Sequence, residues 1–386
     1  MTQEADSVIG AIDGELDAIR AEGLYRALRC VSSPQETVFT LDGARVVNFS
    51  GNNTLGLANN SAVRAAVKDA VERWGAGSGA SRLISGNMTP HERFEEEAAA
   101  FVGSEGALFF PSGYQANIGV IPVLANEETV IVSDELNHAS LIDGMRLSRA
   151  ETRIYAHNDV GALEETLRAI PLSRRVLVVT ESLFSMEGDR APLGAIAALK
   201  KIRPFLFYVD EAHALGATGP SGRGLAAAAG CGGAVDVLLG TLGKAFGVSG
   251  AFVAACRPII DLLKNRCRSF IYTTAPMPAV AAAASAALRL VAEGDGLRRA
   301  LREKVDRFRE LVGPAPGEDH IVPIACPGAE KVMAVCGALL ERGIYCLGIR
   351  PPTVPAGRCQ LRFSITAAHG ADDLEKAAAA LGDVLH

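Results

Sequence analysis

Short apolar runs alternate with longer amphipathic stretches between about residues 105 and 255. The apolar runs are nearly continuous, which is typical of parallel strands buried on both faces. They cover 107–110, 129–133, 176–180, 205–209, 235–240 and 251–255, and helical patterns separate them at 114–125, 139–148, 160–169 and 193–202. This alternation predicts an α/β fold with a doubly wound, mostly parallel sheet. Its ligand site should lie at the carboxyl ends of the strands.

The pattern changes after about residue 293 to charged amphipathic helices with short strands between them. The helices are predicted at 295–311, 329–342 and 372–385, and one strand at 361–366. Because 386 residues exceed what one core usually serves, we expect two domains. The pattern favours a large cofactor-binding α/β domain at 51–293 and a small α+β domain at 294–386. Residues 1–50, a charged helix and a strand pair near 37–48, should pack with the small domain.

Composition narrows the class of protein. With 49% hydrophobic and 21% charged residues, the whole chain should fold. A net charge of −6 argues against a nucleic-acid-binding surface. No apolar stretch reaches membrane-spanning length, and the acidic N-terminus does not resemble a signal peptide. The 8 cysteines lack the spacing of a metal site and are expected to be reduced thiols. We therefore expect a cytoplasmic protein without a metal, whose partners are small molecules or other proteins.

Lys244 differs from the other lysines, which lie in helical patterns with polar neighbours and are expected to be solvated. It follows an apolar run, in the loop 241–247, whose small residues leave space for a ring to approach. Partial desolvation should lower its pKa and suit it to forming a Schiff base. The alternative is a lysine that binds phosphate or an ion-pair partner.

Other candidate residues follow the predicted strands. Asp210 and His213 come after the run 205–209, where a carboxylate could hold a pyridinium nitrogen protonated. Asp210 could instead bind a metal or a ribose, although the chain lacks the glycine-rich and phosphate-loop motifs of nucleotide sites. Residues 112–114, Ser-Gly-Tyr, open a predicted helix whose N-terminus suits an anion.

Two further residues have both a functional and an ordinary interpretation. His138 follows the next strand and could lie over a cofactor ring, or it could be a solvated loop histidine. Arg362 alternates with apolar neighbours in the strand 361–366. It suits a carboxylate ligand, or it could be an exposed sheet arginine.

Taken together, these segments resemble the α-oxoamine synthase family of fold-type I pyridoxal-phosphate enzymes. The resemblance runs through nearly the whole chain with its spacing intact. It covers 48–50, 55–57, 77–82, 112–114, 138–141, 180–189, 210–213, 241–244 and 349–357.

The resemblance implies pyridoxal 5'-phosphate carried on Lys244. It implies catalytic roles for Lys244, His138, Asp210 and His213, and cofactor contacts from those four and from Gly113, Tyr114, Glu181, Ser185, Thr241, Thr273 and Thr274. Thr273 or Thr274 would come from the partner subunit of a homodimer with a shared active site. Implied substrate contacts are Arg26, Asn52, Ser81, His138, Arg350, Thr353 and Arg362. Arg362 would bind the amino-acid carboxylate and Arg26 the far end of the acyl chain.

Within the family, the segment 349–355 is similar to the branch that uses a pimeloyl thioester. Ser81 leaves room for a substrate methyl group, which favours alanine over glycine. Asn52-Asn53-Thr54 and Gly86-Asn87 depart from the family's usual residues close to the substrate. The resemblance therefore predicts the cofactor more firmly than the identity of the acyl group.

The resemblance implies decarboxylative condensation of alanine with a pimeloyl thioester, carried by coenzyme A or an acyl-carrier protein, in biotin synthesis. Alternatives are an oxoamine synthase with another amino acid or acyl group, of the 2-amino-3-ketobutyrate, aminolevulinate or secondary-metabolic type, and an aminotransferase. A non-catalytic subunit like those of serine palmitoyltransferase is a further alternative. Retention of Lys244 counts against that subunit.

Overall fold

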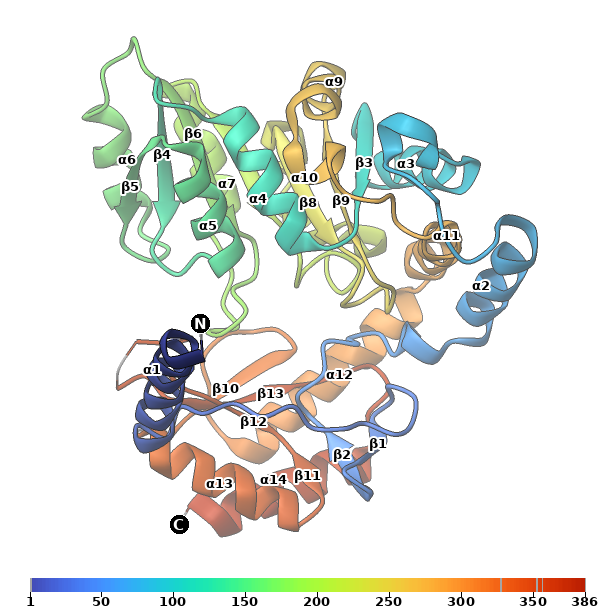
Figure 1. Ribbon diagram of the computed structural model, residues 1–386, viewed down its shortest axis with the longest axis vertical. Helices are drawn as coiled ribbons and strands as arrows, with labels where there is room; N and C mark the ends of the chain where they lie inside the picture. The colour runs from blue at the N-terminus through green and yellow to red at the C-terminus, as the bar shows by residue number, and fades with distance from the viewer. Residues whose placement is uncertain (1, 327, 352, 356, 386) are drawn as a thin grey trace.

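The computed structural model describes residues 2–326, 328–351, 353–355 and 357–385. Figure 1 shows two lobes, a larger one built around a seven-stranded sheet and a smaller one that contains both chain termini. The long helix α12 (Asp295–Val312) begins next to the larger lobe and crosses the smaller one. No helix in the described part of the chain is long and apolar enough to cross a membrane.

The large sheet is mostly parallel, as the sequence predicted. Its strands run in the order β3-β9-β8-β7-β6-β4-β5, and only β9 is antiparallel to its neighbours. The bounds are β3 (Gly106–Phe110), β4 (Thr129–Asp134), β5 (Glu151–Tyr155), β6 (Arg175–Glu181), β7 (Leu206–Asp210), β8 (Val237–Thr241) and β9 (Ala251–Ala255). β5 was not predicted, because it is an edge strand whose polar residues are mostly exposed.

Helices cover both faces of this sheet, which explains the continuous apolar runs. Ile131 packs on one face, while its neighbours Val130 and Val132 pack on the other. The first face carries α4 (Gly113–Leu124), α5 (Ala139–Ser148), α9 (Arg257–Arg266) and α10 (Arg268–Ile271). The second carries α6 (Val160–Arg168), α7 (Leu193–Ala198) and α8 (Gly224–Ala228). The helix predicted at 193–202 ends at Ala198 and continues as the 3-10 turn Leu199–Lys201.

A third group of helices packs beyond β3. It contains α2 (Ser61–Trp74), α3 (Thr89–Val102) and α11 (Pro278–Ala292), and α11 contacts both of the others (Figure 1). Phe94 of α3 makes edge contacts with Phe109 and Phe252 of the sheet, with ring centroids 5.0 and 6.0 Å apart. Short helical turns at Leu57–Asn59, Arg82–Gly86, Pro220–Gly222 and Gly232–Ala234 connect these elements.

The smaller lobe joins segments from both ends of the chain. One sheet has the order β10-β13-β12, with β10 (Ile321–Ala325), β12 (Leu347–Ile349) and β13 (Gln360–Ser364). In the other, β2 (Ala44–Asn48) pairs with β1 (Val38–Leu41) and with β11 (Ile344–Tyr345). The helices are α1 (Thr2–Ala21), α12, α13 (Ala329–Glu341) and α14 (Ala371–Leu385). The exact domain boundaries stay predictions.

The loop 182–190 leaves the carboxyl edge of the large sheet directly after β6 and contacts the smaller lobe. Gly188 has a φ of +68°, and a Cβ there would lie 2.4 Å from the carbonyl oxygen of Ile321 in β10. The close approach therefore requires glycine. Because β3, β4, β6, β7 and β8 end on this same edge, side chains at their ends face the smaller lobe.

Candidate active site

Asp210 ends β7 and is held in a fixed orientation. Its carboxylate, 5% exposed, accepts hydrogen bonds from the Ala212 backbone N–H and from Asn117 Nδ2, both at 2.9 Å. Asn117 Oδ1 in turn accepts from the Tyr208 hydroxyl at 2.7 Å. Asn117 lies one turn into α4. The Asp210 carboxylate is therefore fixed by a helix residue that is itself held by Tyr208 of β7. The sequence analysis assigned Asn117 no role.

His138 precedes α5 and belongs to the same chain of contacts. Its Nδ1 lies 2.8 Å from Ser140 Oγ and accepts the Ser140 backbone N–H at 3.2 Å, while Ser140 Oγ accepts from Asn117. Nδ1 is thus an acceptor, which places the ring proton on Nε2. The residue is exposed, yet its neighbours desolvate the imidazole enough to lower its pKa; Asp210 raises the pKa and Lys244 lowers it. His138 is therefore a neutral donor with Nε2 free.

Lys244 follows β8 and is half-buried. Burial of the amine lowers its pKa from 10.5 to about 8, although Asp210 and Glu181 act to raise it. Among the described residues, no hydrogen-bond partner of the amine is found. The expectation that the other lysines are solvated is wrong for two of them, since Lys200 pairs with Asp236 and Lys304 donates to the Ala367 carbonyl.

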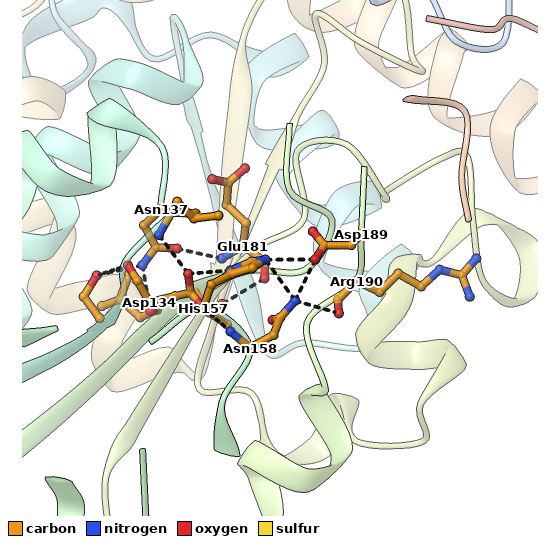
Figure 2. Close-up of polar contacts among 11 residues, drawn as sticks. Asp134, Asn137, His157, Asn158, Glu181, Asp189 and Arg190 are labelled. Carbon is orange, nitrogen blue, oxygen red and sulfur yellow. Dashed lines mark hydrogen bonds and ion pairs between the residues drawn. The ribbon is translucent and has the colours of Figure 1, made fainter. Parts of the chain in front are cut away.

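Two buried carboxyl groups near the strand ends differ sharply. Glu181 is 3% exposed, and its Oε1 has no hydrogen-bond partner among the described residues. Burial and then Asp210 raise its pKa well above the usual value. Figure 2 shows its backbone N–H bound to the Asn137 side chain, at 3.0 Å, with the carboxyl group directed away from that contact. Glu211, by contrast, accepts three hydrogen bonds, from Ser182 and from the N–H groups that begin α8.

His213 is buried where several site residues converge. Burial lowers its pKa well below the usual value, and the positive charges of Lys244 and Arg362 lower it further. The ring of His320, 6.4 Å away between centroids, is also buried, and burial lowers its pKa to about 4. Both rings are therefore neutral, and the site contains no histidine cation near Lys244.

Arg362 reaches the site from β13 and is 7% exposed, which excludes the interpretation as an exposed sheet arginine. Its guanidinium donates to the Ser185 carbonyl at 2.6 Å and to Ser364 Oγ at 2.8 Å, with a longer contact of 3.5 Å to Asn52 Oδ1. All of these acceptors are neutral. Burial lowers its pKa to about 10, so the group remains a cation in need of an anion.

Two of the predicted phosphate contacts, Gly113 and Tyr114, open α4 directly after β3, whereas Thr241 ends β8 and Ser185 lies in the loop 182–190. A Cβ on Gly113 would lie 2.6 Å from Thr241 Cγ2, so glycine lets the helix N-terminus approach β8. Ser112 caps the helix by accepting the Gln115 N–H at 3.2 Å. The Tyr114 hydroxyl donates to Asp143 at 2.5 Å, on the exposed side. The first backbone N–H groups of α4 thus remain available to an anion.

Ser81 and the segment with Thr273 and Thr274 lie next to each other. Ser81 forms an isolated bridge with Thr274, which is exposed. The neighbouring side chains Ile84 and Tyr272 are 80% and 72% exposed, although both are large and apolar.

A groove of about 910 Å³ adjoins Arg362 on the smaller lobe. Asn52 and Met186 line it and connect it to the residues around Arg362. Its apolar part is formed by Val31, Phe39, Leu41, Met333, Leu340 and Ile349. Three predicted substrate residues, Arg26, Arg350 and Thr353, also line it. Arg26 lies 3.4 Å from Thr353 Oγ1, and Arg350 donates to the Tyr25 carbonyl at 3.1 Å.

These residues fit a pyridoxal phosphate group. Lys244 offers a desolvated amine without a partner, Asp210 a fixed carboxylate, and Gly113 an open helix N-terminus. The orphaned Glu181 Oε1 marks a polar position that the described residues leave unsatisfied. The arrangement can bind a ring, its phosphate and one further carboxylate.

Comparisons with known proteins agree with this geometry. The family model for class I and II aminotransferases matches residues 44–381. The chain is 48% identical to 8-amino-7-oxononanoate synthase of Geobacter sulfurreducens over 97% of each chain. It is 46% identical to that of Pelobacter propionicus, over 95% of this chain and 96% of the relative. A structure of a variant of serine palmitoyltransferase from S. paucimobilis with a bound PLP–myriocin aldimine has a TM-score of 0.92 and 29% identity. It covers 98% of this chain and 97% of that one.

Proposed function

Because the chain belongs to the class I and II aminotransferase family, and within it to the α-oxoamine synthases of fold type I, we propose that it condenses L-alanine with a pimeloyl thioester. The products are 8-amino-7-oxononanoate, carbon dioxide and the free thiol, in biotin synthesis. The relatives at 46–48% identity over nearly the whole chain carry the name of this activity. The match to serine palmitoyltransferase is weaker in sequence, at 29% identity.

Pyridoxal phosphate, the cofactor of this family, links to the amine of the substrate when bound and takes up the electron pair released at Cα. Lys244 would hold it, Asp210 would keep its ring nitrogen protonated, and the N-terminus of α4 with Thr241 and Ser185 would receive its phosphate. Glu181, His138 and His213 would contact the ring.

Lys244 is the residue suited to move the Cα proton. With its pKa at about 8, a substantial fraction of the amine is neutral near physiological pH and can act as a base. An exposed lysine, with its usual pKa near 10.4, would be almost wholly protonated there. His138 supplies a neutral Nε2–H that can donate to an oxygen of the second substrate.

The buried Arg362 carries the proposal, because it is a cation held only by neutral acceptors next to Lys244 and the groove. Bidentate binding of the alanine carboxylate would supply the missing anion. The groove then receives the polymethylene chain, with Arg26, Arg350 and Thr353 at the end for a distal carboxylate. Ser81 would leave space for the substrate methyl group.

The exposed apolar side chains near Ser81 and Thr274 support a homodimer with a shared active site. In this arrangement Thr273 or Thr274 of one subunit reaches the phosphate of its partner. The enzyme would work in the cytoplasm, and its acyl donor would be coenzyme A or an acyl-carrier protein.

Release of free thiol by the cofactor-loaded protein tests the proposal. The assay crosses alanine, glycine and serine with pimeloyl, succinyl, acetyl and palmitoyl thioesters. We expect the alanine–pimeloyl pair to give the highest kcat/KM, and we expect the Arg26→Ala variant to lose most of the preference for a chain that ends in a carboxylate. A preference for another pair would identify a different oxoamine synthase, and keto-acid production without thiol would identify an aminotransferase.

A further inference from the structure

His157 lies between two carboxylates beside the active site (Figure 2). Its Nδ1 is 2.9 Å from Asp134 Oδ1 at the end of β4, and its Nε2 is 2.8 Å from Asp189 Oδ2 in the loop 182–190. A carboxylate only accepts hydrogen bonds, so both ring nitrogens must donate and the imidazole is a cation. Burial opposes this charge, but the two carboxylates raise the pKa of His157 to about 10.

The neighbouring residues make the arrangement rigid. Asp134 also accepts the N–H groups of Leu136 and Asn158, each at 2.9 Å. Asn158 adopts a left-handed backbone conformation with φ of 57° and directs its side-chain amide to Asp189 Oδ2 at 3.1 Å. The ring edge of Phe184 meets His157 with centroids 4.4 Å apart.

The loop held by Asp189 also contacts the smaller lobe. Its Ser185 carbonyl accepts the 2.6 Å hydrogen bond from Arg362, and its Met186 carbonyl accepts one of 2.7 Å from Gln360. Arg190 pairs with Asp319 through contacts of 2.6 and 3.0 Å. Figure 2 shows the Arg190 side chain extending away from the His157 cluster. The loop is therefore fixed at the large sheet by His157 and at the smaller lobe by Arg190.

We propose that His157 is a positioning residue for the amino-acid carboxylate. The His157–Asp189 ion pair fixes the loop 182–190, and the Ser185 carbonyl of that loop sets the orientation of Arg362. His157 itself touches neither substrate nor cofactor. This inference deepens the proposed function and rests on its assignment of Arg362 to the alanine carboxylate.

The test measures binding of alanine and of alaninamide, which lacks the carboxylate, to the cofactor-loaded protein by the change in visible absorption. No thioester is present. In His157→Gln and in Asp189→Asn, we expect the Kd of alanine to rise about tenfold or more, because a misplaced group loses binding steeply with displacement. The Kd of alaninamide should stay within about twofold, so the preference for the carboxylate falls.

The double variant shows whether His157 and Asp189 act together as an ion pair or affect alanine binding independently. If the two residues act as one unit, His157→Gln with Asp189→Asn should be no worse for alanine than either single variant. Asp189→Asn also keeps the proposal testable if His157→Gln does not fold.

Lys200→Gln is the matched control. It breaks a partly buried ion pair of 2.5 Å with Asp236. This pair lies before the amino ends of β7 and β8, whereas the active site lies at their carboxyl ends. This variant should lower the melting temperature without changing the alanine preference. Equal losses for alanine and alaninamide in the His157 and Asp189 variants, or a melting shift with no loss of preference, would overturn the proposal. Absence of thiol release by the wild type would instead refute the proposed function while leaving the binding ratios readable.

Discussion

Removing the amine of Lys244 should stabilise the cofactor-free protein. Burial lowers the pKa of this amine from 10.5 to about 8, so below pH 8 the folded protein holds a desolvated ammonium that the unfolded chain exposes to water. At about 1.4 kcal/mol per pH unit, this costs about 3 kcal/mol of unfolding free energy. In Lys244→Met the side chain keeps its approximate length and loses the charge. We expect the variant to be more stable at pH 7 by up to this amount.

The pH dependence has a definite sign. Between pH 8 and 10.5 the unfolded chain binds the proton and the folded protein does not, so wild-type stability rises with pH in this window relative to the variant. The penalty is complete below pH 8 and absent above 10.5. Groups that do not interact with Lys244 cancel in the difference between the two proteins.

Urea unfolding of both cofactor-free proteins at equal concentration, from pH 7 to 10.5, measures this difference. Lys68→Met is the control, because it removes an exposed ammonium on α2 and should change the stability by less than about 0.5 kcal/mol. The reasoning is refuted if Lys244→Met is less stable than wild type at pH 7, or if the difference between them does not shrink by pH 10.5.

Two further predictions concern the carboxylate site and the ring partner. Arg362→Gln should weaken alanine binding by about one to two decades, the value of a charge-assisted hydrogen bond of 1.5–3 kcal/mol. Arg203→Gln, which removes another buried arginine that donates only to backbone carbonyls, should lower the melting temperature and leave alanine binding unchanged in the same titration. Asp210→Asn should retain cofactor but exchange the alanine Cα hydrogen for deuterium far more slowly, as followed by NMR, because a neutral amide stabilises a protonated ring nitrogen less. Near wild-type exchange would mean that Asp210 is not the ring partner.

The sequence predicted those parts of the fold where burial is uniform. β4, β6, β7 and β9 are continuous apolar runs because both faces of the sheet are covered, and their predicted bounds lie within one residue of those found. β5 was missed since its outer edge is solvated and its residues carry no strand pattern. Lys244 and Asp210 could be picked out because each follows a buried strand.

Contacts between distant segments could not be predicted in this way. His157 meets Asp134 and Asp189, which lie 23 and 32 residues away, and only the strand order brings these three together. Asn117 is 93 residues from Asp210, and its position one turn after Ser112 was the single available signal. Glu211 adjoins Asp210 in sequence, yet it binds the start of α8 while Asp210 faces Asn117.

The distribution of charge explains why this site should attract anions. Lys244 and Arg362 are the cations near His213, while His213 and His320 are neutral because burial lowers the pKa of each ring. Burial raises the pKa of Glu181 and so disfavours its charge, while the Asp210 carboxylate is held by hydrogen bonds from Asn117 and Ala212. A buried site of this kind gains from binding the substrate carboxylate, because the buried Arg362 cation is otherwise held only by neutral acceptors. The two desolvated cations weaken the cofactor-free fold. Attachment of the cofactor to Lys244 and binding of a carboxylate to Arg362 should therefore both stabilise the fold, which links folding to loading of the enzyme.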